Sequence, residues 1–351
     1  MNPIRVLAVD DSALMRNMLS AVVNQQPDME MVGTAPDAFI ARELIKQLNP
    51  DVLTLDIDMP RMDGLEFLSR LMRLRPMPVI MISSLTTRGS KATLAALEHG
   101  AVDFLPKPEH RAAGNIECWS QQVVEKIRVA TRARLAQRGP TDRPILPGIT
   151  VRQQSIIAIG SSTGGTEALR RVLMPLPVST PGIVIAQHMP AGFTFSFAQR
   201  LDSLCQIAVR EAQDGEPVLP GTALIAPGDR HMEIISQDNG YRIRLSDAPP
   251  VNRHRPSVDV LFDSVARQAS KHASAAILTG MGGDGARGLL HLRQTGAFTL
   301  AQSEATCVVF GMPREAIALG AAKKVVDLDD ISQCLLDSFN YKNSPQTDLR
   351  R

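Results

Sequence analysis

The chain has 351 residues, a length that favours two domains at roughly 150 residues per domain. With 44% hydrophobic and 21% charged residues it can bury enough apolar surface to fold, which excludes disorder for most of the chain. The 38 basic and 36 acidic residues nearly cancel and aromatic residues make up only 4%, so neither a field that recruits nucleic acid nor a base-stacking platform is expected.

The spacing of the cysteines and the length of the apolar runs indicate the cellular compartment in which the protein is expected. The four cysteines are far apart in sequence and form no C-x-x-C pair, which argues against a disulfide scaffold or a zinc site. The first residues, MNPIRVLAVD, show no secretory leader, and no apolar run approaches the ~18 residues that a spanning helix needs. We therefore expect a cytoplasmic protein with no membrane insertion and no nucleic-acid partner.

The N-terminal third alternates short β-branched runs with stretches of helical periodicity. Strands are predicted over 4–9, 29–33, 51–55, 78–82 and 102–105, and helices after Ser12, up to Leu48, over 64–74, over 88–99 and from about 117. Five such units with short connections predict a parallel sheet that helices cover on both faces. Ligands of such a sheet bind at the carboxyl ends of its strands.

A connecting segment is predicted over residues 121–152. It joins an arginine-rich helix end to a proline-rich stretch, RGPTDRPILPG. A docking patch for nucleic acid is one interpretation of these arginines, but a solvated helix end that continues into a linker is the simpler one. We therefore predict a first domain over 1–120 and a second over 153–345.

The second domain begins another alternation of strands and helices. SIIAIG and PGIVIAQ are predicted strands, with helices from about 165 and over about 195–204. HMEIIS and YRIRLS flank the turn dipeptide Asn239-Gly240, which predicts an antiparallel hairpin. A helix from about 257, the strand AAILTG and a helix past Asp284 follow. The pattern predicts a second parallel-sheet α/β domain with an inserted hairpin.

Acidic side chains follow two strands of the first domain. Asp10 and Asp11 come after the first predicted strand and Asp56 after the third, so three carboxylates converge at one edge of the sheet. A cation such as Mg²⁺ relieves their repulsion and polarises a phosphoryl group. Ser83 and Lys107 end the fourth and fifth strands and are suited to hold phosphoryl oxygens. Single strand-end aspartates are often only helix N-caps, but five matching positions favour a phosphoryl site.

These segments resemble the receiver domain of response regulators, on the motifs VLAVDDS, LDIDMPRMDG, MISS and FLPKP. The resemblance implies a flavodoxin-like fold and a phosphoryl group that Asp56 accepts from a histidine kinase. It further implies Mg²⁺ binding by Asp10, Asp11, Asp56 and the backbone of Asp58, a phosphoryl contact by Lys107, and a switch pair formed by Ser83 and Phe104.

A candidate nucleophile lies at the start of the second domain. Residues 160–164 fit G-x-S-x-G with Ser162 at the centre, between a predicted strand and a helix. Gly160 and Gly164 permit the sharp turn, and the free N–H groups of the helix start favour an oxyanion or a phosphate. A phosphate cradle is the competing interpretation, but no Lys follows as a P-loop requires.

A nucleophilic serine needs a base and a group that orients the base. His188 follows the strand GIVIAQ and Asp284 follows AAILTG, which predicts both at the same edge as Ser162. The order Ser, His, Asp along the chain disfavours the α/β-hydrolase fold. His231 and His254 lie in predicted loops, where either is suited to bind substrate. Cys307 has no base nearby in sequence and is expected to be a buried small residue.

The second domain resembles the chemotaxis protein-glutamate methylesterases, in which a receiver is fused to a serine hydrolase. The motifs GSSTGGTEAL, QHMPAGFT, APGDRHM, NRHRPSVDVLF, LTGMGGDGA and FGMPREA occur in order. The resemblance implies Ser162 as nucleophile, His188 as general base, Asp284 as its orienting group and the backbone N–H of Met281 at the oxyanion site.

Two functions compete at this point. The resemblance implies a phosphorylation-activated esterase that hydrolyses glutamate methyl esters on chemoreceptors, deamidates receptor glutamines, needs Mg²⁺ in the receiver and uses no cofactor in the esterase domain. The alternative is a response regulator whose second domain only binds a partner and whose glycine-rich turn is structural. A DNA-binding output is disfavoured, because no basic recognition helix follows the connecting segment.

Overall fold

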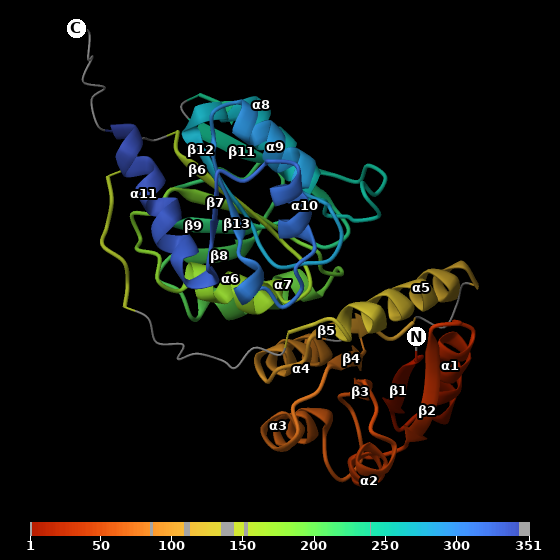
Figure 1. The fold of residues 1–351 in the computed structure, drawn as a ribbon. Coiled ribbons are helices and arrows are strands. Elements are labelled where there is room, and N and C mark those ends of the chain that lie inside the picture. The colour runs from red at the N-terminus through yellow and green to blue at the C-terminus, as the bar shows by residue number, and fades with distance from the viewer. Residues whose placement is uncertain are drawn as a thin grey trace, which may run out of the picture. The chain divides into compact units, whose positions relative to one another are not determined.

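The computed structural model describes residues 2–84, 87–108, 113–134, 144–150, 154–238 and 240–343. The chain divides into two compact units, Met1–Gln137 and Arg138–Arg351, each built on its own sheet (Figure 1). The division falls inside the predicted connecting segment. The domain ends predicted at residues 120 and 153 stay predictions.

The first unit is a doubly wound parallel sheet. Its elements are β1 (Ile4–Val9), α1 (Ala13–Asn24), β2 (Met29–Ala35), α2 (Ala38–Leu48), β3 (Val52–Asp56), α3 (Gly64–Leu74), β4 (Val79–Ser83), α4 (Thr87–Glu98), β5 (Asp103–Pro106) and α5 (Ala113–Ala130). The strand order is β2-β1-β3-β4-β5, with every pair parallel. This is the flavodoxin-like order, and it confirms the fold class expected for this unit.

Side-chain caps set the start of several helices in the first unit. The side chain of Ser12 accepts from the N–H of Met15, that of Asp37 from two N–H groups at the start of α2, and that of Asp63 from Glu66. Each cap satisfies donors that a helix start leaves without an intrahelical partner. The caps are thus Ser12, Asp37 and Asp63, so the capping interpretation does not apply to the strand-end residues Asp10 and Asp56.

The second unit is a larger parallel sheet with a separate hairpin. Its strands are β6 (Ile156–Ser161), β7 (Gly182–Gln187), β8 (Ala208–Glu211), β9 (Thr222–Ile225), β10 (His231–Gln237), β11 (Gly240–Ser246), β12 (Ala273–Ile277), β13 (Phe298–Gln302) and β14 (Lys324–Val326). Its helices are α6 (Gly165–Leu173), α7 (Phe193–Asp202), α8 (Val258–Gln268), α9 (Ala286–Gln294), α10 (Met312–Ala318) and α11 (Ile331–Asn343), with short 3₁₀ turns at Ser270–His272, Glu304–Thr306 and Leu328–Asp330.

The seven-stranded sheet has the order β14-β13-β12-β6-β7-β9-β8, and its pairs are parallel. The antiparallel pair β10-β11 confirms the predicted hairpin and packs against α8. Its predicted turn includes Asn239, which lies outside the described residues. The second α/β class is therefore confirmed, whereas four short strands, β8, β9, β13 and β14, were not predicted.

The centre of the second unit determines where its site lies. Helix α8 packs directly on β6: a Cβ added at Gly160 would lie 2.2 Å from Cγ1 of Val258. Apolar residues of the sheet, α8, α9, α10 and the hairpin form one buried cluster on this face. The three central strands β12, β6 and β7 are thus held rigidly, and their carboxyl ends lie side by side. No helix within the described ranges combines the length and apolar character needed to cross a bilayer.

Candidate functional site

The predicted acidic cluster of the first unit forms at the carboxyl edge of its sheet. Asp10 directly follows β1, Asp56 ends β3, and the carboxylate oxygens of Asp10, Asp11 and Asp56 lie within 4.8 Å of one another. Asp10 and Asp56 are buried while Asp11 is exposed. Lys107, which follows β5, places its Nζ 2.7 Å from Oδ2 of Asp56 and 3.0 Å from Oδ2 of Asp10.

The electrostatics of this cluster favour a bound cation. Burial raises the pKa of Asp56 to about 6, and the charge of Asp10 adds to that rise although Lys107 opposes it. Burial also raises the pKa of Asp10. Because a single lysine offsets three carboxylates, the cluster holds excess negative charge in a site of low polarity. Carboxylate oxygens at this spacing suit Mg²⁺, which keeps several waters and is bound by few carboxylates.

The predicted switch pair lies on the strands beside the cluster. Ser83 ends β4, and its Oγ is buried without a hydrogen-bond partner among the described residues. Phe104 lies on β5 with its side chain buried. A buried hydroxyl without a partner is costly, so Ser83 is poised to bond an oxygen delivered to its edge of the sheet. The repacking of Phe104 on phosphorylation stays a prediction.

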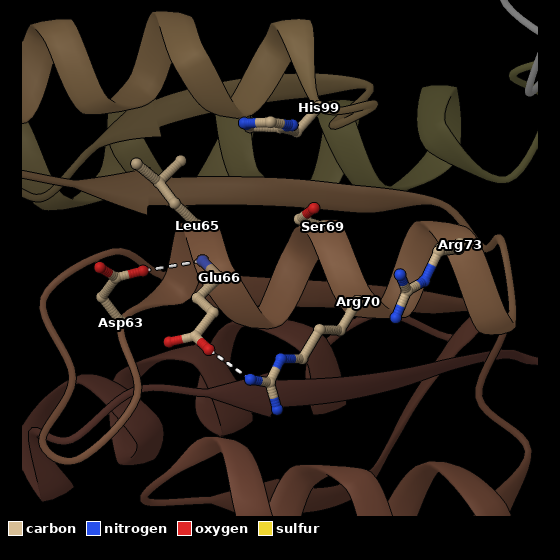
Figure 2. Close-up of a pocket in the computed structure, with 7 residues that line it drawn as sticks. All are labelled: Asp63, Leu65, Glu66, Ser69, Arg70, Arg73 and His99. Carbon is tan, nitrogen blue, oxygen red and sulfur yellow. Dashed lines mark hydrogen bonds and ion pairs between the residues drawn. The ribbon is translucent and has the colours of Figure 1, made fainter.

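An open hollow of about 470 Å³ lies elsewhere on the first unit, along α3 (Figure 2). Leu65, Ser69 and Arg73 line it together with His99, which follows α4. The other lining residues stabilise α3 itself: Asp63 caps the helix, and Glu66 pairs with Arg70 at 2.5 Å. None of the strand-end carboxylates lines the hollow. The hollow is therefore separate from the acidic cluster, which remains the candidate site of this unit.

The candidate residues of the second unit follow three adjacent strands. Ser162 follows β6, His188 follows β7, and Asp284 lies in the loop after β12. Each is followed by a glycine of positive φ and then a helix: Gly164 (77°), Gly192 (84°) and Gly285 (88°) precede α6, α7 and α9. These glycines offer no capping side chain, so the first N–H groups of each helix have no side-chain cap at the strand ends.

Asp284 is a buried carboxylate with an unusually complete set of donors. It accepts hydrogen bonds from His188 Nε2 (2.8 Å), Asn252 Nδ2 (2.7 Å), Ser257 Oγ (2.7 Å) and the N–H groups of Val258 (2.6 Å) and Asp259 (3.3 Å). Burial by itself raises the pKa of Asp284, but these hydrogen bonds outweigh burial and hold the pKa well below its ordinary value. The group is therefore an anion at neutral pH.

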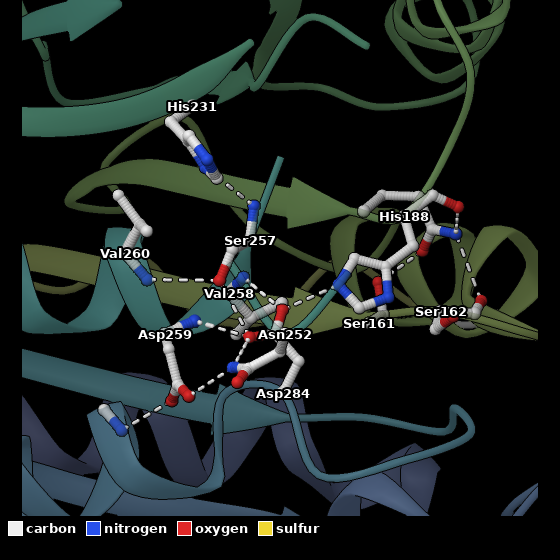
Figure 3. Close-up of polar contacts among 12 residues, drawn as sticks. Ser161, Ser162, His188, His231, Asn252, Ser257, Val258, Asp259, Val260 and Asp284 are labelled. Atoms are coloured by element: carbon white, nitrogen blue, oxygen red, sulfur yellow. Dashed lines mark hydrogen bonds and ion pairs between the residues drawn. The ribbon is translucent and has the colours of Figure 1, made fainter. Parts of the chain in front are cut away.

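His188 has one ring nitrogen bonded and one open. Nε2 faces Asp284 at 2.8 Å, so it carries the proton of the neutral ring and Nδ1 is the acceptor. Nδ1 is buried and has no hydrogen-bond partner in the described part of the chain. In Figure 3 it lies on the side of the ring that faces Ser162. The arrangement provides a base nitrogen with no competing proton donor.

Ser162 lies against the loop that carries Met281. The N–H of Ser162 donates to the carbonyl of Thr279, and a Cβ added at Gly280 would lie 2.7 Å from Cβ of Ser162. Within the described ranges the N–H of Met281 donates to no acceptor, and neither does the hydroxyl of Ser162. An N–H without an acceptor in the described ranges, on the loop that contacts Ser162, is suited to an oxyanion site, and the role of Met281 stays a prediction.

Gln187 is a residue that motif reasoning missed. It ends β7, and its side chain is buried. Its Nε2 donates to the carbonyls of Ser162 (3.1 Å) and His188 (3.2 Å), and its Oε1 accepts from Ser161 Oγ at 2.6 Å. One amide thus fixes the backbone of both candidate residues. Its signals in the sequence were its place at the end of the predicted strand GIVIAQ and at the start of the motif QHMPAGFT.

The three remaining candidates from the sequence, His231, His254 and Cys307, have different surroundings. His231 is buried, accepts from the N–H of Ser257 at Nδ1 and bonds the carbonyl of Pro249 at Nε2, so the interpretation of it as a substrate ligand was wrong: both nitrogens are used in structure. His254 stacks on His188, with ring centroids 3.7 Å apart. Cys307 is buried, as expected.

Two parallel-sheet units, one with an acidic strand-end cluster and one with a serine, a histidine and an aspartate at adjacent strand ends, define a response regulator with a hydrolase-type output domain. Known families match both units. The response regulator receiver domain matches residues 6–114, and the CheB methylesterase family matches residues 157–335. The chain belongs to the CheB methylesterase family and carries a response regulator receiver domain.

Individual relatives agree with this assignment. The protein-glutamate methylesterase/protein-glutamine glutaminase of Salmonella typhimurium is 59% identical over 338 residues, which cover 96% of this chain and 97% of the relative. The protein of that name from Shigella flexneri is 60% identical, covering 97% of this chain and 98% of its own. The crystal structure of the Thermotoga maritima CheB methylesterase catalytic domain is 42% identical, has a TM-score of 0.51, and covers 52% of this chain and 98% of its own.

Proposed function

We propose that the protein hydrolyses glutamate methyl esters on chemoreceptors, with Ser162 as nucleophile, His188 as general base and Asp284 as the group that orients His188. One observation carries this assignment above the others. The buried Nδ1 of His188 is left without a partner while Nε2 is held by an ionised Asp284. A base in that state gains a hydrogen bond only when a donor such as the Ser162 hydroxyl turns toward it.

The reaction is an acyl transfer in two steps. Ser162 Oγ attacks the ester carbonyl carbon while Nδ1 of His188 takes the hydroxyl proton. Backbone N–H groups, that of Met281 among them, hold the oxyanion of the tetrahedral intermediate. The intermediate expels methanol, which takes the proton from His188, and leaves an acyl ester on Ser162. Water attacks that ester by the same route and restores the serine, releasing the glutamate carboxylate.

The receiver supplies the control. A histidine kinase is the proposed phosphodonor, Asp56 the acceptor, and Asp10, Asp11 and Asp56 the residues that would hold Mg²⁺, which shields charge on the transferred phosphoryl group. Lys107 and Ser83 then contact phosphoryl oxygens. The likeness to chemotaxis methylesterases supports assigning the reaction to the cytoplasm.

Deamidation of receptor glutamines is a second activity of the same site. The relatives from Salmonella typhimurium and Shigella flexneri both carry the glutaminase name. An acyl ester on Ser162 is reached from a primary amide as well as from a methyl ester, with ammonia as the leaving group. The amide is the slower substrate, because its nitrogen must be protonated by His188 before it leaves.

The test combines active-site labelling with product analysis. An ester-type serine probe is expected to modify Ser162, and the full chain is expected to release methanol from methylated receptors in membranes. Ser162→Ala should show neither, and its thermal unfolding should match that of the parent. A parent protein that folds but is not labelled and releases no methanol would favour the alternative, an output domain that only binds a partner.

A further inference from the structure

A tight turn precedes α8 and reaches the proposed active site. Val251 and His254 exchange backbone hydrogen bonds of 3.1 and 2.9 Å, and the two residues between them, Asn252 and Arg253, have φ values of 51° and 68°. Two successive left-handed residues define the two-residue turn that matches the twist of a hairpin. Asn tolerates this conformation better than most residues. The turn carries two side chains to the Asp284 and His188 pair.

Asn252 bridges two buried carboxylates. Its Nδ2 donates to Oδ1 of Asp284 at 2.7 Å and to Oδ2 of Asp259 at 2.8 Å (Figure 3). Its Oδ1 accepts from Nη2 of Arg287 at 3.0 Å. A guanidinium can only donate and a carboxylate can only accept, so Arg287 on one side and the two aspartates on the other fix which way the amide points. The amide joins the Ser257 hydroxyl and the Asp259 N–H on Oδ1 of Asp284, while Oδ2 meets His188 and the N–H of Val258.

His254 covers one face of His188. The two rings are nearly parallel, with an interplanar angle of 8° and centroids 3.7 Å apart. The stack leaves the imidazole of His188 free to rotate only within its own plane. It also helps to explain why Nδ1 is buried although no described residue bonds it. The same turn thus touches both members of the pair, one through a hydrogen bond and one through ring contact.

We infer that Asn252 and His254 are positioning residues for this pair, an inference that rests on the proposed function. Asn252 sets the rotation of the Asp284 carboxylate so that Oδ2 meets Nε2. His254 sets the plane of the His188 ring so that Nδ1 stays directed at Ser162. A base displaced by a fraction of an ångström binds substrate as before but accepts the proton less efficiently. The effect of losing either side chain falls on kcat and not on KM.

Asn252→Gly tests the amide, with Arg253→Gly as its matched control. Glycine suits positive φ at both positions, so both variants keep the turn. Arg253 is exposed and forms no hydrogen bond or ion pair with the described residues, so its variant should turn over methylated receptors within about twofold of the parent. Asn252→Gly should lower kcat about tenfold with KM unchanged, as loss of a hydrogen bond to a charged group predicts. Equal kcat values in the two variants would overturn the role of Asn252.

Arg287→Ala serves as a second variant that leaves the core untouched, since the Arg287 side chain is 68% exposed. Without the guanidinium the amide of Asn252 keeps its bonds to the two carboxylates but loses the donor to Oδ1, so it is held less firmly and kcat should fall about threefold. A kcat equal to that of the parent would contradict the proposed clamp even if Asn252→Gly proved unstable.

Two substitutions of His254 test the ring contact. His254→Phe keeps a flat ring over His188 and should retain most of kcat, while His254→Ala should lose about tenfold. Equal rates in the two variants would overturn the role of His254. Ser162→Ala runs in the same assay: if it still turns over, the proposed function has failed. If it is inactive while Asn252→Gly and His254→Ala match the parent, only the present inference has failed.

Discussion

The two polar sites of this protein lie at the same place in two similar sheets but are built in opposite ways. In the receiver three carboxylates crowd around one lysine, and burial raises the pKa of Asp56 to about 6. In the second unit five donors surround the carboxylate of Asp284 and hold its pKa below the ordinary value, although the carboxylate of Asp259 lies nearby. The receiver cluster has too little positive charge for its carboxylates, whereas the Asp284 carboxylate is stabilised by hydrogen-bond donors of its own unit.

The difference shows what each site is missing. Beside the receiver cluster the buried Oγ of Ser83 has no partner in the described ranges, and at the second site the same holds for Nδ1 of His188. A buried polar atom without a hydrogen bond lowers the stability of the fold. Ser83 Oγ and His188 Nδ1 are therefore positions suited to bond an incoming group. In the function proposed above, a cation and a phosphoryl oxygen would complete the receiver cluster, whereas a proton donor alone would complete the second site. Four experiments probe this contrast.

The largest effect is expected at the second site. Ser162→Ala should reduce ester hydrolysis by roughly 10⁶-fold and Asp284→Asn by roughly 10⁴-fold, because the nucleophile is indispensable while the orienting carboxylate stabilises the imidazolium and its tautomer. Methanol release from methylated receptors measures both. An Asp284→Asn variant as active as the parent would remove Asp284 from the mechanism.

The two carboxylates should give opposite pH dependence of stability. The pKa of Asp56 is raised from 3.8 to about 6, so the folded receiver binds the extra proton, and its free energy of unfolding should fall by about 3 kcal/mol as pH rises from about 4 to 6. The pKa of Asp284 is lowered, so the second unit should instead lose stability as pH falls below the ordinary value near 3.8.

Each slope has its own readout. Trp119, the only tryptophan, is buried in α5 and bonds the carbonyl of Pro106 at 2.8 Å, so its fluorescence follows the receiver. Amide exchange in α8 follows the second unit. Asp56→Asn should flatten the receiver slope between pH 4 and 6. If the parent and Asp56→Asn show the same slope there, the charge shortage is not centred on Asp56.

Control by the receiver should be a smaller effect. We expect the unphosphorylated receiver to inhibit, so residues 150–351 alone should be about 5- to 150-fold faster than the unphosphorylated full chain, the range of ordinary coupling energies. A small phosphodonor with Mg²⁺ should raise the full chain toward the rate of the fragment. A fragment no faster than the unphosphorylated chain would point instead to an activating contact made on phosphorylation.

The smallest effect is cation binding without phosphorylation. Mg²⁺ at ten times its Kd should stabilise the receiver by about 1.4 kcal/mol, since it binds the folded cluster and not the unfolded chain. The gain should shrink near pH 5, where Asp56 is largely protonated. Thermal unfolding followed by Trp119 fluorescence measures it, with the exposed pair Arg42 and Glu43 as a control site: Glu43→Gln should leave the Mg²⁺ effect unchanged.

Much of both sites was predictable from the sequence because strand ends are visible in it. A run of apolar residues followed by Asp10, Asp56, Ser162 or His188 places those side chains at the carboxyl edge of a parallel sheet, whatever the details of packing. The glycines that follow in the second unit strengthen this prediction, because they let the chain turn from strand into helix. The alternating pattern also predicted the parallel class of both sheets, but not their strand order, and it missed β8, β9, β13 and β14.

Tertiary structure alone decided how those residues are supported. Asn252 and Asp284 are 32 residues apart, and no local pattern indicates that an exposed turn delivers an amide to a buried carboxylate. No local pattern indicates the stack between His188 and His254 either. Nor does one indicate that both ring nitrogens of His231 form hydrogen bonds within the protein. The sequence by itself determined which side chains meet at the sheet edge. Packing decided which nitrogen of His188 is left as the acceptor, because a ring nitrogen becomes an acceptor only when a neighbour fixes the proton on the other one.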